Sequence, residues 1–393
     1  MSGDVVIAGA ARTPFGCFGG ALKEVSAPEL GAYIIDAVLD RTGLAGEAVE
    51  AAYLGVGMIG SGMLTPVRQA VLRSRLAETT PSFGVDRACC SGMTAVGLAF
   101  KDIRAGESSL VIAGGFESLS RTPLLLPRSH AARIGQVTLD DPLRMRGDVV
   151  ALSISGYTAR EALAHGIDRA QQDEWALQSH ERYFAAEAKG FFSVERIAFE
   201  TEAARLDKDE APRADTSLEK LARLGTVHDS ETVTAGNAPG LSDGAAAMVV
   251  ASREAAAAHG LDVRARVLAY AQVCGGPTSG TYTPAVAIRA ALKKADARLE
   301  DVALIEINEA FAATPLVSTL KLADGDRAQA QRLRARTNVH GGAVAIGHPL
   351  GASGARLVMT LAEGLWARGG GLGVAAICGG FGQGDAMLIR VDG

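Results

Sequence analysis

An internal repeat is the feature that most constrains how this chain can fold. In the first half, Ser91-Gly92 opens a predicted helix, and the strand after it ends in Ala113-Gly114-Gly115-Phe116. In the second half, Ser353-Gly354, a helix and a strand lead to Cys378-Gly379-Gly380-Phe381. The spacing from the serine to the first glycine of the pair is 23 residues in one copy and 26 in the other. Because the order and the type of the elements agree, the pattern indicates a duplicated α/β unit.

Short continuous apolar runs alternate with helical patterns in both halves. Val5–Ala8 and Leu110–Ala113 are two such runs, and each has the character of a buried strand. Alternation of this kind predicts an α/β fold in which helices cover a parallel or mixed sheet on both faces.

Between the two copies the pattern changes to a charged stretch with predicted helices at 158–164 and 169–189. We interpret this stretch as an insertion that shapes a substrate site. The expected division is an N-terminal α/β half at residues 1–118, an inserted, mostly helical loop domain at 119–249, and a C-terminal α/β half at 250–393.

Composition excludes several classes of function. The chain of 393 residues has a net charge of −5 and no Lys/Arg cluster, which argues against nucleic acid as a partner. No apolar run approaches the roughly 20 residues of a membrane span, and the amino terminus leads into a strand without a signal segment. Five cysteines without metal-ligand spacing indicate free thiols in a reducing compartment. We therefore expect a cytoplasmic protein without a metal site.

Cys89 is the candidate nucleophile. It lies between an extended segment, Ser82–Val85, and a helical pattern, and the positive end of a helix favours a thiolate. Gly92, just inside the helix, would leave room for a substrate to approach the sulfur. Considered alone, Cys89 is better explained as a small apolar residue of the core, since free cysteines are often buried, and only the rest of the chain can overturn that explanation.

Three further residues carry candidate chemistry. His348 lies in Gly347-His348-Pro349, just before the second-copy helix, at the position equivalent to Cys89, and it is a candidate base. Cys378, at a strand end before two glycines, reads as an exposed thiol at a turn. Asn308 is explained equally well as a catalytic residue or as the N-cap of a helix that starts at Glu309. Helix starts at equivalent places in the two copies would face a shared crevice.

With these motifs together, the sequence resembles the thiolases, the acyl-CoA C-acyltransferases that include acetyl-CoA acetyltransferase. The resemblance covers nearly the whole chain, and its motifs occur in the family's order: Ala10-Ala11-Arg12-Thr13-Pro14, Phe18-Gly19-Gly20, Ser26-Ala27-Pro28-Glu29-Leu30, Cys89-Cys90-Ser91-Gly92-Met93, Ala113-Gly114-Gly115-Phe116-Glu117-Ser118, Thr234-Ala235-Gly236-Asn237-Ala238, Asp243-Gly244-Ala245, Asn308-Glu309-Ala310-Phe311, Gly347-His348-Pro349 and Cys378-Gly379-Gly380. The fold implied is the duplicated five-layer α-β-α-β-α thiolase fold with an inserted loop domain.

The resemblance also implies roles for individual residues. Cys89 would carry the acyl group as a thioester after His348 removes its proton, and Cys378 would be the second acid–base. A water held by Asn308 would stabilise the enolate together with His348, and the N–H groups of Cys89 and Gly380 would form the oxyanion hole. Coenzyme A (CoA) and acyl-CoA would be substrates, with no permanently bound cofactor. The family's CoA-binding and acyl-binding positions fall on Ala238, Pro239, Gly240, Phe311, Ile154 and Ser155.

Several of these binding positions depart from the family's pattern. Ile154-Ser155-Gly156 stands where many short-chain members have His-Met-Gly, and Pro239 replaces a serine that hydrogen-bonds the pantetheine arm. Proline offers neither a hydroxyl nor an N–H. Gly225 stands where the family usually has a basic residue near the adenine end of CoA. Phe381 stands where it has a third glycine, and Thr278 falls roughly where it has a methionine in the pocket. We therefore expect an altered or longer acyl chain in place of a two-carbon acetoacetyl specificity.

Rival functions remain at this point. A β-ketoacyl synthase shares the fold but uses histidine partners where this chain has Cys378. A non-catalytic thiolase-like scaffold or partner subunit is the alternative from another class. Members of the family are dimers or dimers of dimers, so the resemblance implies a homodimer or homotetramer.

Overall fold

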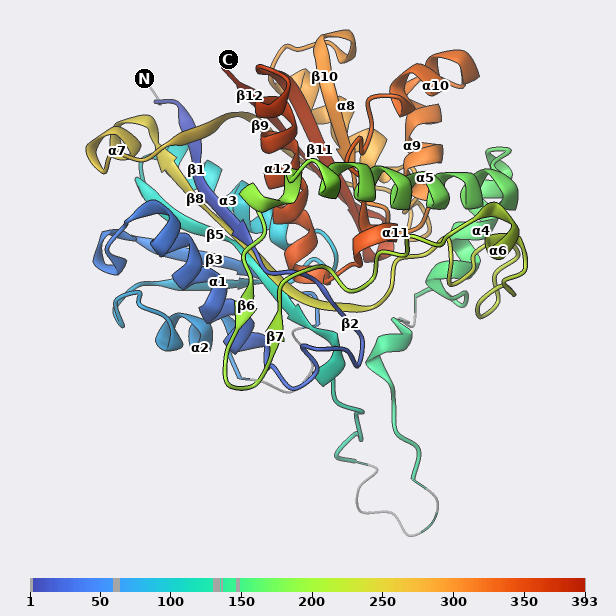
Figure 1. Ribbon diagram of the computed structural model, residues 1–393, viewed down its shortest axis with the longest axis horizontal. Coiled ribbons are helices and arrows are strands. Elements are labelled where there is room, and N and C mark those ends of the chain that lie inside the picture. The colour runs from blue at the N-terminus through green and yellow to red at the C-terminus, as the bar shows by residue number, and fades with distance from the viewer. Residues whose placement is uncertain (1–2, 59–63, 130–134, 136, 146–148, 393) are drawn as a thin grey trace.

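A computed structural model describes residues 3–58, 64–129, 135, 137–145 and 149–392. Its two α/β halves stand side by side, with the first on the blue side of Figure 1 and the second on the orange and red side. In the first half, neighbouring strands follow the order β1 (Val5–Arg12), β8 (Ser242–Ser252), β5 (Leu110–Ser118), β3 (Ala51–Gly55) and β4 (Ser82–Val85). In the second half, the order is β9 (Val263–Cys274), β12 (Gln383–Val391), β11 (Gly371–Gly379) and β10 (Val302–Ile307).

The two halves repeat one topology, which confirms the duplicated fold. The strand after each Ser-Gly helix, β5 or β11, lies between an antiparallel neighbour, β8 or β12, and a parallel one, β3 or β10. The first strand β1 pairs with both β8 and β9 and thereby joins the halves into one ten-stranded sheet, which includes the short β2 (Gly16–Cys17) paired with β8.

Helices cover this sheet in three layers. Between the two halves lie α3 (Ser91–Ala105) and α12 (Leu350–Ala367), which contact strands of both. Outside the first half lie α1 (Ala27–Thr42) and α2 (Pro66–Arg73), and outside the second lies α8 (Thr283–Lys294), followed by α9 (Ala313–Leu322) and α10 (Arg327–Arg334). Separate apolar clusters fill the central, first outer and second outer interfaces, as a five-layer architecture requires.

The two Ser-Gly motifs of the repeat make the contact between the central helices. A Cβ atom on Gly92 would lie 2.3 Å from the carbonyl oxygen of Gly351, and one on Gly354 would lie 2.3 Å from the backbone nitrogen of Met93. Only glycine therefore lets α3 and α12 touch through their backbones at this point. The prediction that Gly92 leaves room for a substrate is wrong, because the backbone of α12 occupies that space.

Local capping signals set the ends of α1 as the sequence predicts. Ser26 and Glu29 form the capping box, and Gly43 ends the helix in the left-handed conformation at φ 68°. The small α7 (Arg253–Ala258) has a similar start, since the side chain of Ser252 accepts a hydrogen bond from Ala255.

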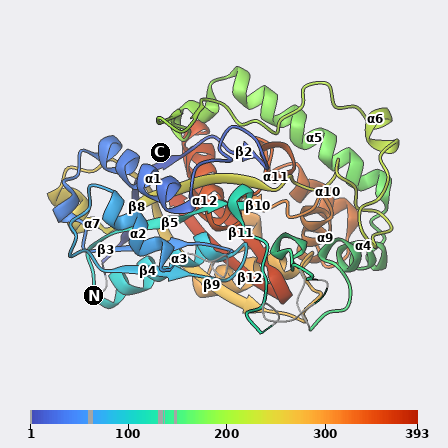
Figure 2. The same ribbon diagram turned by 90° about the horizontal axis from the view of Figure 1, so that it is seen from below.

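The helices of the insertion lie against the second half, where their green ribbon appears in both views (Figures 1 and 2), whereas Phe199 packs into the apolar cluster of the first half. Its helices are α4 (Ile154–Ala164), α5 (Arg169–Ala188) and α6 (Leu218–Ala222), and a small ribbon is formed by β6 (Phe199–Glu200) and β7 (Arg205–Leu206). Helix α5 contacts α9 and the single turn α11 (Ala343–Ile346), which precedes His348. Residues 242–249, which the expected division assigns to the insertion, instead form most of β8 within the first half, because their apolar run is buried between β1 and β5.

A buried ion-pair cluster fastens the insertion to the first strand. Arg12 on β1 contacts Glu195 at 2.6 Å and Asp209 at 2.7 Å, and all three side chains are fully buried. Burial alone would raise the pKa of Asp209, but the attraction of Arg12 and its hydrogen bonds hold that pKa below its ordinary value. The insertion is thus anchored by charges as well as by apolar contacts.

Among the helices in the described ranges, we find none with the length and apolar character needed to cross a membrane.

Candidate active site

Cys89 lies directly before α3, in a tight turn. Ala88, the preceding residue, has a left-handed backbone at φ 51°, and Cys90 is the N-cap of the helix. The side chain of Cys89 is half-buried and lines a cavity of about 250 Å³. Burial, together with the nearby Cys378 and Glu117, raises the pKa of Cys89. The prediction of a thiolate stabilised by the helix is therefore not met, and this thiol needs a base to become a nucleophile.

His348 is held as a neutral imidazole directly before α12. Its Nδ1 lies 2.6 Å from the hydroxyl of Ser353, and that hydroxyl donates to the carbonyl of Pro349 at 2.9 Å. Because the hydroxyl proton is committed to Pro349, Ser353 accepts the Nδ1–H proton, and Nε2 keeps its lone pair. Burial lowers the pKa of His348 to about 3. His348 therefore has the tautomer that a base needs.

Asn308 points at the histidine and does not cap a helix. Its Nδ2 lies 3.3 Å from His348 Nε2, and its backbone N–H donates to Ala376 at 2.9 Å. The next helix, α9, begins only at Ala313, so the N-cap explanation is wrong. Within the described part of the chain, the buried Oδ1 of Asn308 has no hydrogen-bond partner. This oxygen is thus an unpaired buried acceptor beside His348, and the water-holding role that the resemblance implies for Asn308 stays a prediction.

Cys378 and Gly380 lie at the end of β11 and in the turn after it. Cys378 is only 5% exposed, which corrects the expectation of an exposed thiol, and burial raises its pKa to about 12. The turn packs closely on the Cys89 loop: a Cβ atom on Gly379 would lie 2.8 Å from the carbonyl oxygen of Arg87. The backbone segments that carry the two predicted oxyanion N–H groups are therefore neighbours.

Glu117 is a buried carboxylate near the nucleophile to which sequence reasoning assigned no role. It accepts hydrogen bonds from the backbone of Gly57 at 2.7 Å and of Gly351 at 2.9 Å. Burial raises the pKa of Glu117 to about 7, and its charge contributes to the raised pKa of Cys89. The sequence contains one signal that could have pointed to Glu117, namely its position directly after the Gly114-Gly115-Phe116 motif of the repeat. A buried carboxylate needs hydrogen-bond donors, and backbone N–H groups supply them to Glu117.

The cavity beside Cys89 brings most of the predicted site together. It is lined by Cys89 and His348 and by all six predicted binding positions, Ala238, Pro239, Gly240, Phe311, Ile154 and Ser155. Cys378, Asn308 and Gly380 are not among its lining residues. Arg144 and His228 also line it, although no sequence motif points to them. Tyr157, a buried residue whose pKa is raised by burial and by both thiols, likewise lies outside the predicted motifs.

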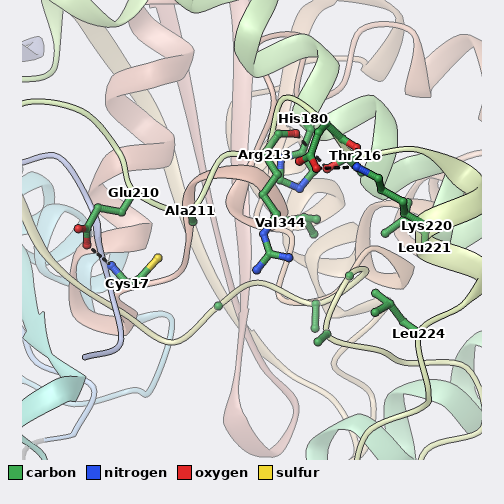
Figure 3. Close-up of a pocket in the computed structure, with 15 residues that line it drawn as sticks. Cys17, His180, Glu210, Ala211, Arg213, Thr216, Lys220, Leu221, Leu224 and Val344 are labelled. Carbon is green, nitrogen blue, oxygen red and sulfur yellow. Dashed lines mark hydrogen bonds and ion pairs between the residues drawn. The ribbon is translucent and has the colours of Figure 1, made fainter. Parts of the chain in front are cut away.

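A second cavity, of about 270 Å³, lies on the other side of the 238–240 segment, since Ala238 and Gly240 line both cavities. Figure 3 shows Cys17 and Glu210 on one side of it and His180, Arg213, Thr216 and Lys220 on the other. Glu210 accepts a hydrogen bond from the backbone of Cys17 at 2.8 Å. Neither Cys89 nor His348 lines this second cavity, so it is not the reaction chamber.

Removal of the Ser353 hydroxyl tests the assigned tautomer of His348. In Ser353→Ala, Nδ1 loses its acceptor, and a proton on Nε2 becomes competitive, so we expect kcat to fall about 10- to 100-fold. Stability should fall by about 1–3 kcal/mol, as expected when a buried hydrogen-bonding group loses its partner. Ser318→Ala is a matched control, since the buried hydroxyl of Ser318 bonds Thr281 at 2.7 Å outside the site. Equal kcat values for the two variants would refute the tautomer assignment.

Comparisons with known proteins agree along the whole chain. The thiolase N-terminal domain model matches residues 5–254, and the thiolase C-terminal domain model matches residues 261–391. The chain is 38% identical to a beta-ketoadipyl-CoA thiolase of Pseudomonas aeruginosa, with 99% of this chain and all of that protein covered. It is 40% identical to a probable acetyl-CoA acetyltransferase of Escherichia coli, with 99% of each covered.

Solved structures give the same result. The human mitochondrial 3-ketoacyl-CoA thiolase superposes with a TM-score of 0.92 at 34% identity, covering 100% of this chain and 99% of that one. The CoA complex of human mitochondrial 3-ketoacyl-CoA thiolase gives a TM-score of 0.93 at 34% identity, covering 100% and 98%. The chain is a member of the thiolase family of acyltransferases.

Proposed function

We propose that this thiolase works with Cys89 as the acyl carrier, His348 as its base and Cys378 as a second acid–base. One observation above all supports the proposal: Cys89 and the neutral imidazole of His348 line the same cavity. Each of them lies directly before one of the two central helices. Thiolases transfer acyl groups between CoA thioesters, either by cleaving a 3-oxoacyl-CoA with CoA or by the reverse Claisen condensation.

In the cleavage direction, the first step needs a base. His348 Nε2 takes the proton of the Cys89 thiol, and the sulfur attacks the 3-oxo carbon of the substrate. The bond between the second and third carbons then breaks and leaves an acyl group on Cys89. Because burial raises the pKa of Cys378 to about 12, this group holds its proton until the enolate accepts it. Acetyl-CoA is thereby released.

The second half-reaction returns the enzyme to its starting state. The proton held by His348 passes to the Cys378 thiolate. His348 then takes the proton of an incoming CoA thiol, and the CoA sulfur attacks the thioester on Cys89. Cys89 leaves with the proton held by His348. The N–H groups of Cys89 and Gly380 would stabilise the oxyanion of each tetrahedral intermediate, and Asn308 with His348 the enolate oxygen.

Binding of CoA would use the 238–240 segment together with Phe311, Ile154 and Ser155. Pro239 presents no donor to the pantetheine arm, so shape and apolar contact must replace a hydrogen bond there. A small hydroxyl at Ser155, held 3.0 Å from Ser153, occupies less volume than a methionine would. We infer that the acyl chain is longer or more polar than acetoacetyl. Beta-ketoadipyl-CoA thiolases among the relatives are consistent with this inference.

Intact-protein mass spectrometry after brief exposure to acyl donors tests both points. We expect an acyl adduct that maps to the Cys89 peptide and is released by added CoA. A medium-chain or dicarboxylic 3-oxoacyl-CoA should load faster than acetoacetyl-CoA, and Ser155→Met should reverse that preference by filling the cavity. Equal loading of all chain lengths would refute the specificity. No adduct on folded protein would instead favour the alternative, a non-catalytic scaffold or partner subunit.

Other assignments are part of the same proposal. We infer a role in fatty acid or related acyl-CoA metabolism, a cytoplasmic location and a homodimer or homotetramer. We retain the three-part division, with the end of the insertion moved before β8.

A further inference from the structure

A cluster of hydrogen-bonded side chains lies outside the lining of the catalytic cavity and takes no part in the mechanism above. At its centre is Asp385 on β12, which is fully buried. Its Oδ2 accepts hydrogen bonds from the hydroxyls of Thr94 and Tyr270, both at 2.6 Å, and its Oδ1 pairs with Arg87. The three partners come from α3, from β9 and from the loop before α3, so one carboxylate holds together three elements.

Arg87 extends this cluster towards the reacting groups. It lies two residues before Cys89, and its Nε donates to the side-chain oxygen of Gln383 at 2.9 Å. The amide nitrogen of Gln383 in turn donates to the carbonyl of Gly380 at 3.2 Å. A continuous set of hydrogen bonds therefore runs from the loop of the nucleophile to the turn that carries the second proposed oxyanion donor.

The two segments that these hydrogen bonds connect each contain a residue in an energetically unfavourable backbone conformation. Ala88, beside the nucleophile, has φ 51°, and Phe381, after Gly380, has φ 59°. Residues other than glycine in this region cost on the order of 1–3 kcal/mol and persist only where their surroundings hold them. The two segments also touch, since a Cβ atom on Gly379 would lie 3.0 Å from the sulfur of Cys90. Release of either segment would therefore shift the other.

We propose that Asp385 is a positioning residue of this thiolase that, through Arg87 and Gln383, fixes the Cys89 loop relative to the turn at Gly380. The proposal rests on the roles given above to Cys89 and Gly380. The carboxylate does not touch a substrate. It acts by orienting Arg87, whose planar guanidinium carries the donors that reach Asp385, Thr94 and Gln383.

Asp385→Asn tests the proposal because it keeps the shape of the side chain and removes the charge that holds Arg87. A misplacement of about 1 Å can cost about 10²-fold in rate. We therefore expect kcat to fall about 10²-fold, with KM for CoA unchanged and the rate of Cys89 acylation in a single turnover reduced equally. Gln383→Met is the milder second variant. It leaves the buried ion pair intact but removes both hydrogen bonds of the Gln383 side-chain amide, and kcat should fall about 10-fold.

Arg253→Met is the matched control. Arg253 also pairs with an aspartate, Asp4, at 3.1 Å, but it does so at the surface and outside the Asp385 cluster. Its substitution should leave kcat and acylation unchanged. If Gln383→Met and Asp385→Asn fold but acylate at the rate of the unaltered protein, the cluster serves stability alone and the proposal is overturned. If the proposed function itself is wrong, the unaltered protein will form no acyl adduct on Cys89. That result differs from failure of the positioning proposal, in which the unaltered protein and both variants acylate equally fast.

Discussion

Replacing Cys89 by alanine is expected to abolish the acyl-enzyme and to lower kcat by roughly 10⁴- to 10⁶-fold, the loss typical of removing a nucleophile. Cys378→Ala should behave differently. It removes the acid that protonates the enolate, so cleavage and condensation should be lost to a similar degree. Loading of Cys89 needs only His348, so exchange of an acyl group between acyl-CoA and isotopically labelled CoA should persist in this variant.

These two variants separate the roles of the thiols in one pair of assays. Carbon–carbon cleavage is followed by the loss of 3-oxoacyl-CoA, and exchange by the transfer of label into acyl-CoA. Cys274→Ala provides the control, because Cys274 is exposed and lies at the end of β9. If Cys378→Ala lost exchange as completely as Cys89→Ala, the assignment of Cys378 to enolate protonation alone would be wrong.

Arg12→Met is expected to cost about 3–5 kcal/mol of unfolding free energy, because it leaves the carboxylates of Glu195 and Asp209 buried without their partner. The insertion should loosen first, since both acids belong to it and Arg12 belongs to β1. Denaturant unfolding measures the loss, and limited proteolysis between α5 and α6 should locate it.

Arg75→Met is the comparison for that experiment. Arg75 also forms a short ion pair, with Asp40 at 2.6 Å, but the two side chains are 54% and 69% exposed. An exposed pair contributes about 0–1 kcal/mol, so this variant should unfold almost as the unaltered protein does. Similar losses for the two variants would show that burial does not determine the contribution of Arg12.

Much of the fold was predictable because the repeat and the capping signals are local. The capping box at Ser26 and the pairing of Ser91-Gly92 with Ser353-Gly354 depend on neighbouring residues and their order, and both appear in the structure. Candidate site residues were found for the same reason, since His348 and Cys89 occupy equivalent helix starts. Their joint lining of one cavity follows from the stacking of α3 on α12.

What the sequence could not supply was the environment of each group. The pKa of Cys89 and the exposure of Cys378 depend on segments hundreds of residues away, and burial reversed both expectations. Gly92 was misread because the backbone that fills its space belongs to Gly351. Glu117 was passed over because the donors it organises lie in two other segments.

The pairing of β1 between β8 and β9 has a consequence for synthesis of the protein. Strand β1, Val5–Arg12, has its neighbours at Ser242–Ser252 and Val263–Cys274, more than 200 residues later in the chain. Both of its edges therefore stay unpaired until more than half of the chain has been translated, and unpaired apolar edges invite association with other chains. We expect nascent chains to depend on a chaperone until β9 has emerged, and folding to be slow because its decisive contacts are so distant in sequence.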